Sequence, residues 1–210
     1  YKNSAAANEN GIFANEIVSV TVPQRKGEPL TIKEDEEYKN VKFEKIPQLR
    51  AAFSKDGTVT AANASTINDG ASALILASTK AVIKYDLKPI AKILSFADAA
   101  QEPQWFTTAP TIAAPKALKL AKMNSNDVDF FEVNEAFSVV PLAFNKILDI
   151  DINKVNVHGG AVSMGHPLGA SGARIVTTLS NVLQSKNATV GCAVICNGGG
   201  GASSIVIEKL

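Results

Sequence analysis

Residues 128–148, VDFFEVNEAFSVVPLAFNKIL, decide the fold, because a predicted strand over Val128 to Val133 is followed directly by a predicted helix over Glu135 to Leu148. The same alternation recurs on both sides of this stretch. Aliphatic and β-branched runs predict strands at 90–96, 154–157, 188–196 and 202–208, and helices are predicted at 109–121 and 169–183. Strands that alternate with helices favour an α/β sheet covered by helices on both faces.

The first third of the chain is less regular. Residues 24–48 are dense in Lys and Glu and are punctuated by prolines, which indicates exposed loop or short helix. Residues 71–77 predict a buried strand, with a short helix over 79–84. The run from Gly70, GASALIL, matches the run from Gly201, GASSIVI, in residue type, which favours two similar halves with a boundary near Lys88 and Pro89. Coincidence is the alternative, because such runs commonly enter buried strands.

The composition excludes several classes of protein. The 210 residues are 46% hydrophobic, enough to bury a core, and 21 basic against 20 acidic residues leave a net charge of +1. Such a balance offers no broad field for nucleic acid or for an anionic membrane. The apolar runs fall far short of the roughly 20 residues of a membrane-spanning helix. Cys192 and Cys196 lie four apart on a predicted strand, roughly 13 Å apart, which excludes a disulfide and indicates a reducing compartment.

Two glycine-rich segments are candidates for chemistry. The first, HGGAVSMGHPLGASG over His158 to Gly172, places His166 just ahead of a predicted helix, where glycines allow close approach of a ligand to the backbone. The second, CNGGGG from Cys196, has four successive glycines that each cost about 0.5–1 kcal/mol relative to Ala. Contact with a substrate would account for them. The alternatives are a histidine that only caps a helix and a cysteine that is inert in the core.

Asn134 lies where the strand of the deciding stretch passes into its helix. It is either a helix N-cap or a polar group that faces a site. Together with NEAF at 134–137, GHPLG at 165–169 and CNGGGG at 196–201, the segments TVTAANAS at 58–65 and NDG at 68–70 resemble the thiolase family in order and spacing. The resemblance covers essentially the whole chain and is greatest to the short-chain acetoacetyl-CoA thiolases (acetyl-CoA C-acetyltransferases).

This resemblance implies the thiolase fold, in which two βαβαβαββ halves with mixed five-stranded sheets form αβαβα layers and a loop domain is inserted in the first half. By that mapping, residues 1–67 are the end of the loop domain with its CoA-binding loop, residues 68–88 finish the N-terminal half, and residues 89–210 form the complete C-terminal domain. The first half is therefore expected to be only partly present.

The resemblance also implies a reaction: Claisen condensation of two acetyl-CoA to acetoacetyl-CoA plus CoA, and the reverse thiolysis, through an acetyl-cysteine. His166 matches the group that takes the proton of the nucleophilic thiol, and Cys196 matches the base and acid for the carbon acid. Asn134, through a water, and His166 match one oxyanion site, and the N–H of Gly198 matches part of the other. The nucleophilic cysteine is expected upstream of Tyr1, so the fragment alone is expected to be inactive.

Coenzyme A is implied as a substrate, with no tightly bound cofactor. Asn40 replaces an arginine usual in close relatives, which weakens one phosphate contact. The alternative for Lys42 and Lys45 is that they are ordinary solvated lysines. The alternative for Phe53, Ala61 and Ile67 is plain core packing. The residues that match CoA-contacting positions are Tyr1, Asn40, Val41, Lys42, Lys45, Phe53, Ala61, Ser65 and Ile67.

A potassium ion near Ser65 is implied by a match to potassium-activated mitochondrial members; the alternative is that the alanines only let the chain turn. Its ligands would be Tyr1, Ala61, Ala62, Ala64 and Val162.

The resemblance further implies a homotetramer, with a homodimer in some branches, and the mitochondrial matrix or the cytoplasm as the compartment. The peroxisome is disfavoured, because the final Glu208, Lys209 and Leu210 only faintly resemble its Ser-Lys-Leu signal. Any targeting segment is expected upstream of Tyr1. Three rivals remain: a longer-chain 3-ketoacyl-CoA thiolase of β-oxidation, a non-catalytic acyl-CoA or lipid carrier, and a decarboxylating or hydroxymethylglutaryl-type condensing enzyme. A carrier would need neither His166 nor Cys196, whose side chains are expected to converge on one site.

Overall fold

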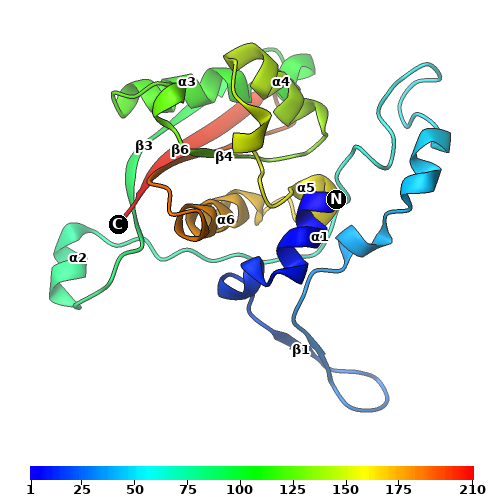
Figure 1. Ribbon diagram of the computed structural model, residues 1–210, viewed down its shortest axis with the longest axis horizontal. Coiled ribbons are helices and arrows are strands. Elements are labelled where there is room, and N and C mark those ends of the chain that lie inside the picture. Colours follow the sequence, from blue (N-terminus) through cyan, green and yellow to red (C-terminus); the bar gives the residue numbers. More distant parts are fainter.

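A four-stranded mixed sheet forms the centre of the computed structural model, which describes all 210 residues (Figure 1). The strand order is β3-β6-β5-β4, in which β4 and β5 are parallel and β6 runs antiparallel to both of its neighbours. A register shift between Ile93 and Ser95 interrupts the pairing of β3 with β6. The strands are β3 (Ala91–Ala100), β4 (Phe130–Val133), β5 (Val190–Cys196) and β6 (Gly201–Lys209).

Helices cover both faces of this sheet, as predicted (Figure 1). On one face lie α3 (Pro110–Leu120) and α4 (Val139–Leu148), and on the other lies α6 (Ser171–Ser185). The fully buried alanines of α3 allow this helix to pack against β3 and β6. The rings of Phe131 of β4 and Phe144 of α4 pack edge to face, with their centroids 5.6 Å apart. Each such aromatic side chain contributes about 1.5–3 kcal/mol by burial.

The other face has its own smaller core, formed by Ile175, Leu179 and Leu183 of α6 against the sheet. Gly191 of β5 is required there, because a β-carbon at its position would approach the Leu179 side chain to 2.6 Å. No helix of the structure is both long and apolar enough to cross a membrane.

The first ninety residues form small elements around this domain. They are α1 (Lys2–Glu9), the hairpin of β1 (Val20–Val22) and β2 (Leu30–Ile32), α2 (Thr79–Lys84), and 3-10 helices at Ile12–Asn15, Glu37–Asn40 and Phe43–Gln48. The later short elements are α5 (Ala161–Met164) and 3-10 helices at Pro103–Thr108, Ser125–Asp127 and Ile152–Lys154. The Asn181 side chain of α6 fixes the N-terminal segment against this helix by donating to the Ile12 carbonyl at 2.8 Å. The prediction of exposed loop or short helix over 24–48 is confirmed except at Leu30–Ile32, which form β2 of the hairpin.

The predicted strand at 71–77 is wrong. These residues form neither helix nor strand, and the side chains of Ile75 and Leu76 are 93% and 76% exposed. A strand needs a neighbour that completes its backbone hydrogen bonds, and no strand of this chain pairs with 71–77. Ser72 of this segment instead lies beside α6, where its hydroxyl is 3.3 Å from that of Thr177.

The predicted strand at 154–157 is reduced to an isolated parallel bridge between Phe131 and Val155, so the sheet has four strands and not five. Asn156 breaks the strand with a left-handed backbone (φ 48°). Its side chain replaces the strand pairing, because the carboxamide accepts from the N–H of Val133 and donates to the carbonyl of Val133, both at 2.8 Å. Asparagine is among the few residues that tolerate this conformation.

The predicted helix at 135–148 starts four residues late, at Val139. The backbone groups of its expected first turn pair with segment 58–65 and not with each other. The N–H of Ser65 donates to the Ala136 carbonyl, and the N–H of Ser138 donates to the Asn63 carbonyl. The remaining helices and strands of residues 79–210 match their predictions within a few residues.

Glu132 of β4 is a buried carboxyl, 2% exposed, beneath α6. Its closest positive group is the Arg174 guanidinium at 3.9 Å, and its Oε1 atom has no hydrogen-bond partner. Burial raises the pKa of Glu132 from 4.5 to about 8, and the charge of Arg174 only partly opposes this. Burial outweighs the ion pair because 3.9 Å is the outer limit of such a contact.

We expect Glu132→Gln to flatten the dependence of stability on pH. Between about pH 4.5 and 8 the folded protein keeps a proton on Glu132 that the unfolded chain releases, so the free energy of unfolding falls as pH rises. The slope removed is at most about 1.4 kcal/mol per pH unit. Urea denaturation at pH 5, 6, 7 and 8 measures it, with Glu28→Gln in the exposed hairpin loop as the control. Equal slopes for the two variants would contradict the assignment.

Candidate active site

His166 lies in the turn between α5 and α6 and is 8% exposed. Its backbone N–H donates to the carbonyl of Thr66 at 2.9 Å, which ties the turn to segment 58–68. Gly165, just before it, has φ 89°, and the Asn68 side chain occupies the space that a β-carbon would need. The backbone of the histidine is therefore fixed from two sides.

The ring of His166 contacts one polar group at each nitrogen. Nδ1 lies 2.6 Å from Oγ of Ser171, the first residue of α6, and Nε2 lies 3.4 Å from Nδ2 of Asn134. Burial lowers the pKa of His166, and the positive charge of Arg174 lowers it further. The ring is therefore neutral at pH 7 and can accept a proton.

Asn134 follows β4 directly and is 1% exposed. It is not an N-cap, because the next helix starts only at Val139. Its backbone N–H continues the parallel pairing by donating to the carbonyl of Val194 at 2.9 Å, and its side-chain Oδ1 has no partner in the protein. An unpaired buried oxygen costs about 1–3 kcal/mol, so this carboxamide is available for a polar ligand or water.

Cys196 is the last residue of β5, two residues beyond Val194. It is 8% exposed, and burial raises the pKa of its thiol. Since β4 and β5 are parallel, their carboxyl ends meet at one edge of the sheet, and this edge carries both Asn134 and Cys196. The structure thus places Asn134 beside His166 by direct contact and near Cys196 through the pairing of the two strands. Both cysteines are free, as predicted.

The glycine run after Cys196 is a tight turn that connects β5 to β6. Oδ1 of Asn197 accepts from the N–H groups of Gly199 and Gly201. Gly200 has φ 86°, and a β-carbon there would meet the backbone of residues 101–103, so both reasons favour glycine. Gly198 is exposed, its N–H donates to no group of the protein, and a β-carbon there would meet nothing. Its N–H is thus free to bind a ligand.

Most of the positions predicted to contact coenzyme A are exposed, and one of them, Ser65, is held against the residues that follow β4. Ser65 donates its hydroxyl to the Ala136 carbonyl at 2.9 Å, two residues from Asn134. Phe53 is 76% exposed and Ile67 is 83% exposed, which excludes core packing as their role. Asn40, Lys42, Lys45 and Ala61 are also exposed, and Val41 is half-buried.

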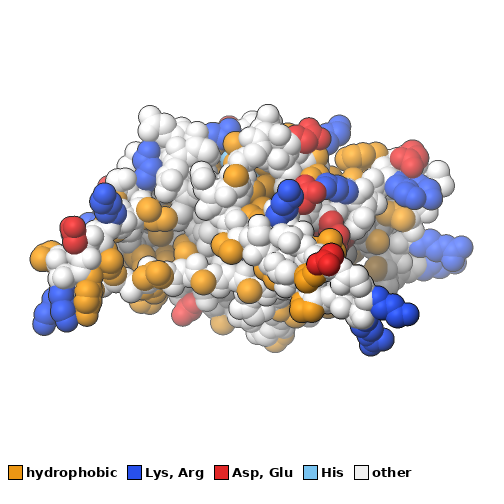
Figure 2. Space-filling view, turned by 90° about the horizontal axis from the view of Figure 1, so that it is seen from below, with side chains coloured by type: hydrophobic (Ala, Val, Ile, Leu, Met, Phe, Trp, Pro, Cys, Tyr) orange, Lys and Arg blue, Asp and Glu red, His pale blue; other side chains and the backbone are white.

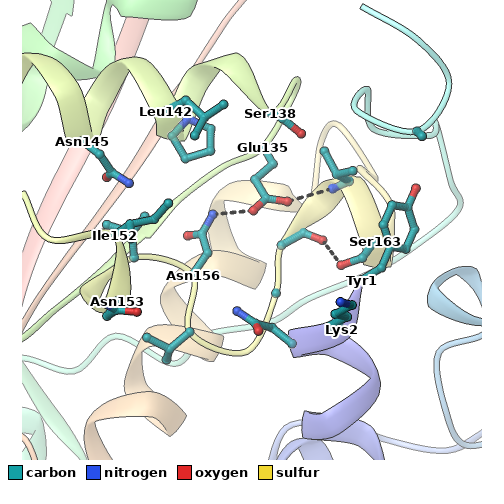
Figure 3. A pocket seen from close by; sticks show the side chains of 18 of the residues that line it. Tyr1, Lys2, Glu135, Ser138, Leu142, Asn145, Ile152, Asn153, Asn156 and Ser163 are labelled. Carbon is teal, nitrogen blue, oxygen red and sulfur yellow. Dashed lines mark hydrogen bonds between the residues drawn. The ribbon is translucent and has the colours of Figure 1, made fainter. Parts of the chain in front are cut away.

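Three of the five predicted potassium ligands, Tyr1, Ala62 and Val162, line one cavity of about 770 Å³ (Figure 3). The carbonyls of Ala61, Ala62, Ala64 and Val162 accept no hydrogen bond within the protein. The cavity also holds the Glu135 carboxylate, which accepts from the Asn156 side chain at 2.8 Å and from the N–H of Val162 at 3.1 Å. Backbone carbonyl oxygens coordinate potassium in other proteins, so these oxygens beside one carboxylate can hold a cation.

Sequence reasoning missed four residues of this region: Ser171, Arg174, Glu135 and Asn156. Ser171 and Glu135 stand inside the quoted motifs, so a polar side chain close to a candidate histidine or asparagine was the available signal. Arg174 and Asn156 act through contacts across the fold, and no local pattern marks them.

Comparison with known proteins agrees with this geometry. The family model described as "Thiolase, C-terminal domain" matches residues 87–209, and that described as "Thiolase, N-terminal domain" matches residues 1–80. Among curated proteins, a probable acetyl-CoA acetyltransferase of Dictyostelium discoideum is 55% identical over 210 residues, all of this chain and 51% of that protein. A mitochondrial acetyl-CoA acetyltransferase of Danio rerio is also 55% identical, over all of this chain and 50% of that protein.

Solved structures give the same result. The Acat5 thiolase of Ascaris suum in complex with coenzyme A superposes with a TM-score of 0.90 at 47% identity, and the acetyl-CoA acetyltransferase of Bacillus anthracis with 0.96 at 37% identity. Each comparison covers all of this chain and 53% of the other chain, so the chain spans about half the length of these relatives. The predicted resemblance and the predicted thiolase fold are confirmed, and the chain belongs to the thiolase family.

Proposed function

We propose that the protein containing this chain is an acetyl-CoA C-acetyltransferase that condenses two acetyl-CoA to acetoacetyl-CoA plus CoA and catalyses the reverse thiolysis. The observation that carries the proposal is the buried edge where Asn134 contacts a neutral His166 and β5 ends at Cys196. The names of relatives at 52–55% identity, all acetyl-CoA acetyltransferases, support it.

In the first half-reaction, Nε2 of His166 takes the proton of a nucleophilic cysteine outside this chain, and the S–H electron pair stays on sulfur. The thiolate attacks the thioester carbonyl of acetyl-CoA. Collapse of the tetrahedral adduct expels the thiolate of CoA, which takes the proton of Cys196. An acetyl-enzyme and a Cys196 thiolate result.

In the second half-reaction, the Cys196 thiolate removes a proton from the methyl group of a second acetyl-CoA. The carbanion attacks the acetyl-enzyme carbonyl, a carbon–carbon bond forms, and the nucleophilic thiolate leaves with the proton held by His166. The raised pKa of Cys196 suits this step, because a thiolate with a higher pKa is a stronger base.

Two thioester oxygens gain negative charge in this cycle, and each needs preorganised donors. The Nε2 side of His166, with a water on the unpaired carboxamide of Asn134, would serve one oxygen. The free N–H of Gly198, with that of the nucleophile, would serve the other. Phe53 and Ile67 would contact the pantetheine arm, and Lys42 and Lys45 the phosphates.

Among the alternatives, the longer-chain thiolase is less favoured, because the human mitochondrial 3-ketoacyl-CoA thiolase is 35% identical, against 52–55% for the curated acetyl-CoA acetyltransferases. We also propose the division into loop domain, residues 1–67, end of the N-terminal half, 68–88, and C-terminal domain, 89–210.

A homotetramer is proposed, with size-exclusion chromatography and light scattering as its test. Relatives named for mitochondria and for the cytosol both occur; we favour the mitochondrial matrix.

Cys196→Ala in the complete protein should separate the two half-reactions. Acetyl transfer to the enzyme should still form a covalent adduct, because it needs the nucleophile, His166 and an oxyanion site. Condensation should fall by about 10²- to 10⁴-fold, the usual cost of a lost acid or base. Mass spectrometry of the intact protein detects the adduct, and deuterium exchange at the methyl group of acetyl-CoA reports carbanion formation.

The matched control is Cys192→Ala on the same strand. It removes a fully buried thiol whose sulfur contacts the Ser204 hydroxyl. Burial raises the pKa of Cys192 to about 11, so this thiol stays protonated and inert. His166→Ala should differ from both by slowing adduct formation as well. If Cys196→Ala exchanged methyl protons at the rate of the Cys192→Ala control, Cys196 would be a structural thiol.

A potassium ion near Ser65 is a separate proposal, supported by the free carbonyls and by Glu135 at the cavity. When bound, the ion would order segment 58–65 against residues 136–138 and would supply no acid or base. Tyr1, Ala61, Ala62, Ala64 and Val162 would hold it.

Potassium chloride should therefore raise coenzyme affinity and rate relative to sodium chloride at equal ionic strength, with a higher melting temperature as a second readout. Glu135→Gln should weaken the potassium dependence, because it removes the one carboxylate of the cavity while keeping the size of the side chain. Equal affinity, rate and melting temperature in the two salts would remove the proposal.

A further inference from the structure

The polar group that contacts the Nδ1 side of His166 is the hydroxyl of Ser171. The distance from Nδ1 to Oγ is 2.6 Å, Ser171 is fully buried, and the ring is the only hydrogen-bond partner of this hydroxyl within the protein. Water has no access to Ser171, so nothing else can take its place.

The backbone holds this hydroxyl in position. Ala170 and Ser171 both donate their N–H groups to the Pro167 carbonyl, at 2.7 Å and 3.1 Å, so the turn after His166 closes onto the start of α6. Pro167 in turn packs against Gly70, where a β-carbon would approach its ring to 2.8 Å. The histidine and the serine are thus fixed to the same short turn.

The two ring contacts agree with one arrangement of protons. With the Asn134 carboxamide turned so that Nδ2 faces Nε2, we assign the lone pair to Nε2 and the ring proton to Nδ1, with Ser171 Oγ as its acceptor. In this tautomer Nε2 is the basic nitrogen. When Nε2 gains a proton, the Nδ1–H bond to Ser171 becomes charge-assisted and strengthens.

We propose that Ser171 is a positioning residue for the chemistry of His166, in that its hydroxyl accepts the Nδ1 proton and so keeps Nε2 the unprotonated nitrogen that takes the proton of the reacting thiol. This rests on the proposed function. The proton passes from the thiol sulfur to Nε2 and later returns to a thiolate, while the Nδ1 proton stays bonded toward Ser171 throughout.

A neutral acceptor suits a proton that must be returned. A carboxylate at this place would stabilise the imidazolium strongly and retain its proton, whereas a hydroxyl stabilises it modestly. The charged side chain that acts on the ring is Arg174 of α6, which opposes the imidazolium. The other contacts of His166, with Asn134 after β4 and with the Thr66 carbonyl of segment 58–68, are neutral.

The test is Ser171→Ala in the complete protein, with the rate of acetyl-adduct formation followed from pH 5 to pH 9. The imidazolium loses its acceptor, so the plateau rate should fall by about 10- to 100-fold, at the lower end of what acid–base catalysis contributes. The acid limb, where protonation of His166 stops the reaction, should move to lower pH. Affinity for coenzyme A should be unchanged.

The matched control is Ser95→Ala, which removes another buried hydroxyl with a 2.6 Å bond, here to the Ala117 carbonyl of α3. It should keep the wild-type rate and acid limb, even if it melts at a lower temperature. Ser171→Thr retains the acceptor oxygen, and it should restore most of the rate lost in Ser171→Ala.

Three outcomes would overturn the proposal. A Ser171→Ala enzyme with the rate and acid limb of Ser95→Ala would show that the hydroxyl is only structural. A Ser171→Thr enzyme that is folded by circular dichroism yet as slow as Ser171→Ala would show that the oxygen does not act. If the unsubstituted protein formed no adduct, the proposed function itself would fail, and the role of Ser171 with it.

Discussion

The parallel pairing of β4 with β5 is the constraint on which the rest of the structure depends. It runs in register from Phe130 opposite Gly191 to Val133 opposite Val194, and the backbone of Asn134 extends it by one more bond. Because both strands point the same way, their last residues reach the same edge, and the turns after them must lie there too. Two backbone hydrogen bonds tie the segment of Ser65 to residues 136–138, and one more ties His166 to Thr66, so both segments close over this edge.

Burial removes charge from this region. It lowers the pKa of His166 and raises the pKa values of Cys196 and Glu132, so in each case the neutral form is favoured. Arg174 remains as a charge between Glu132 and the histidine, and it lowers the pKa values of both. Neutral groups in a dry site can exchange protons with a substrate without first shedding bound water.

The helices and strands of residues 79–210 were largely predictable, because each is set by a local period of apolar residues. The strands at 71–77 and 154–157 were not, since a strand also depends on a partner that no local pattern reveals. At the site, motifs identified Asn134, His166 and Cys196 as residues of interest. The contact between Ser171 and His166, and the replacement of strand pairing by the Asn156 side chain, arise only when the turns around α6 and β4 close.

The exposed segment at 71–77 affects the solubility of the chain. Figure 2 shows hydrophobic side chains exposed across the lower face of the molecule, and Leu74, Ile75 and Leu76 add an extended aliphatic run with unpaired backbone groups. Such a run is a template for intermolecular β-pairing and aggregation. Handled by itself at high concentration, the chain is therefore prone to precipitate, and a covering partner or a charge introduced at Ile75 would improve its solubility.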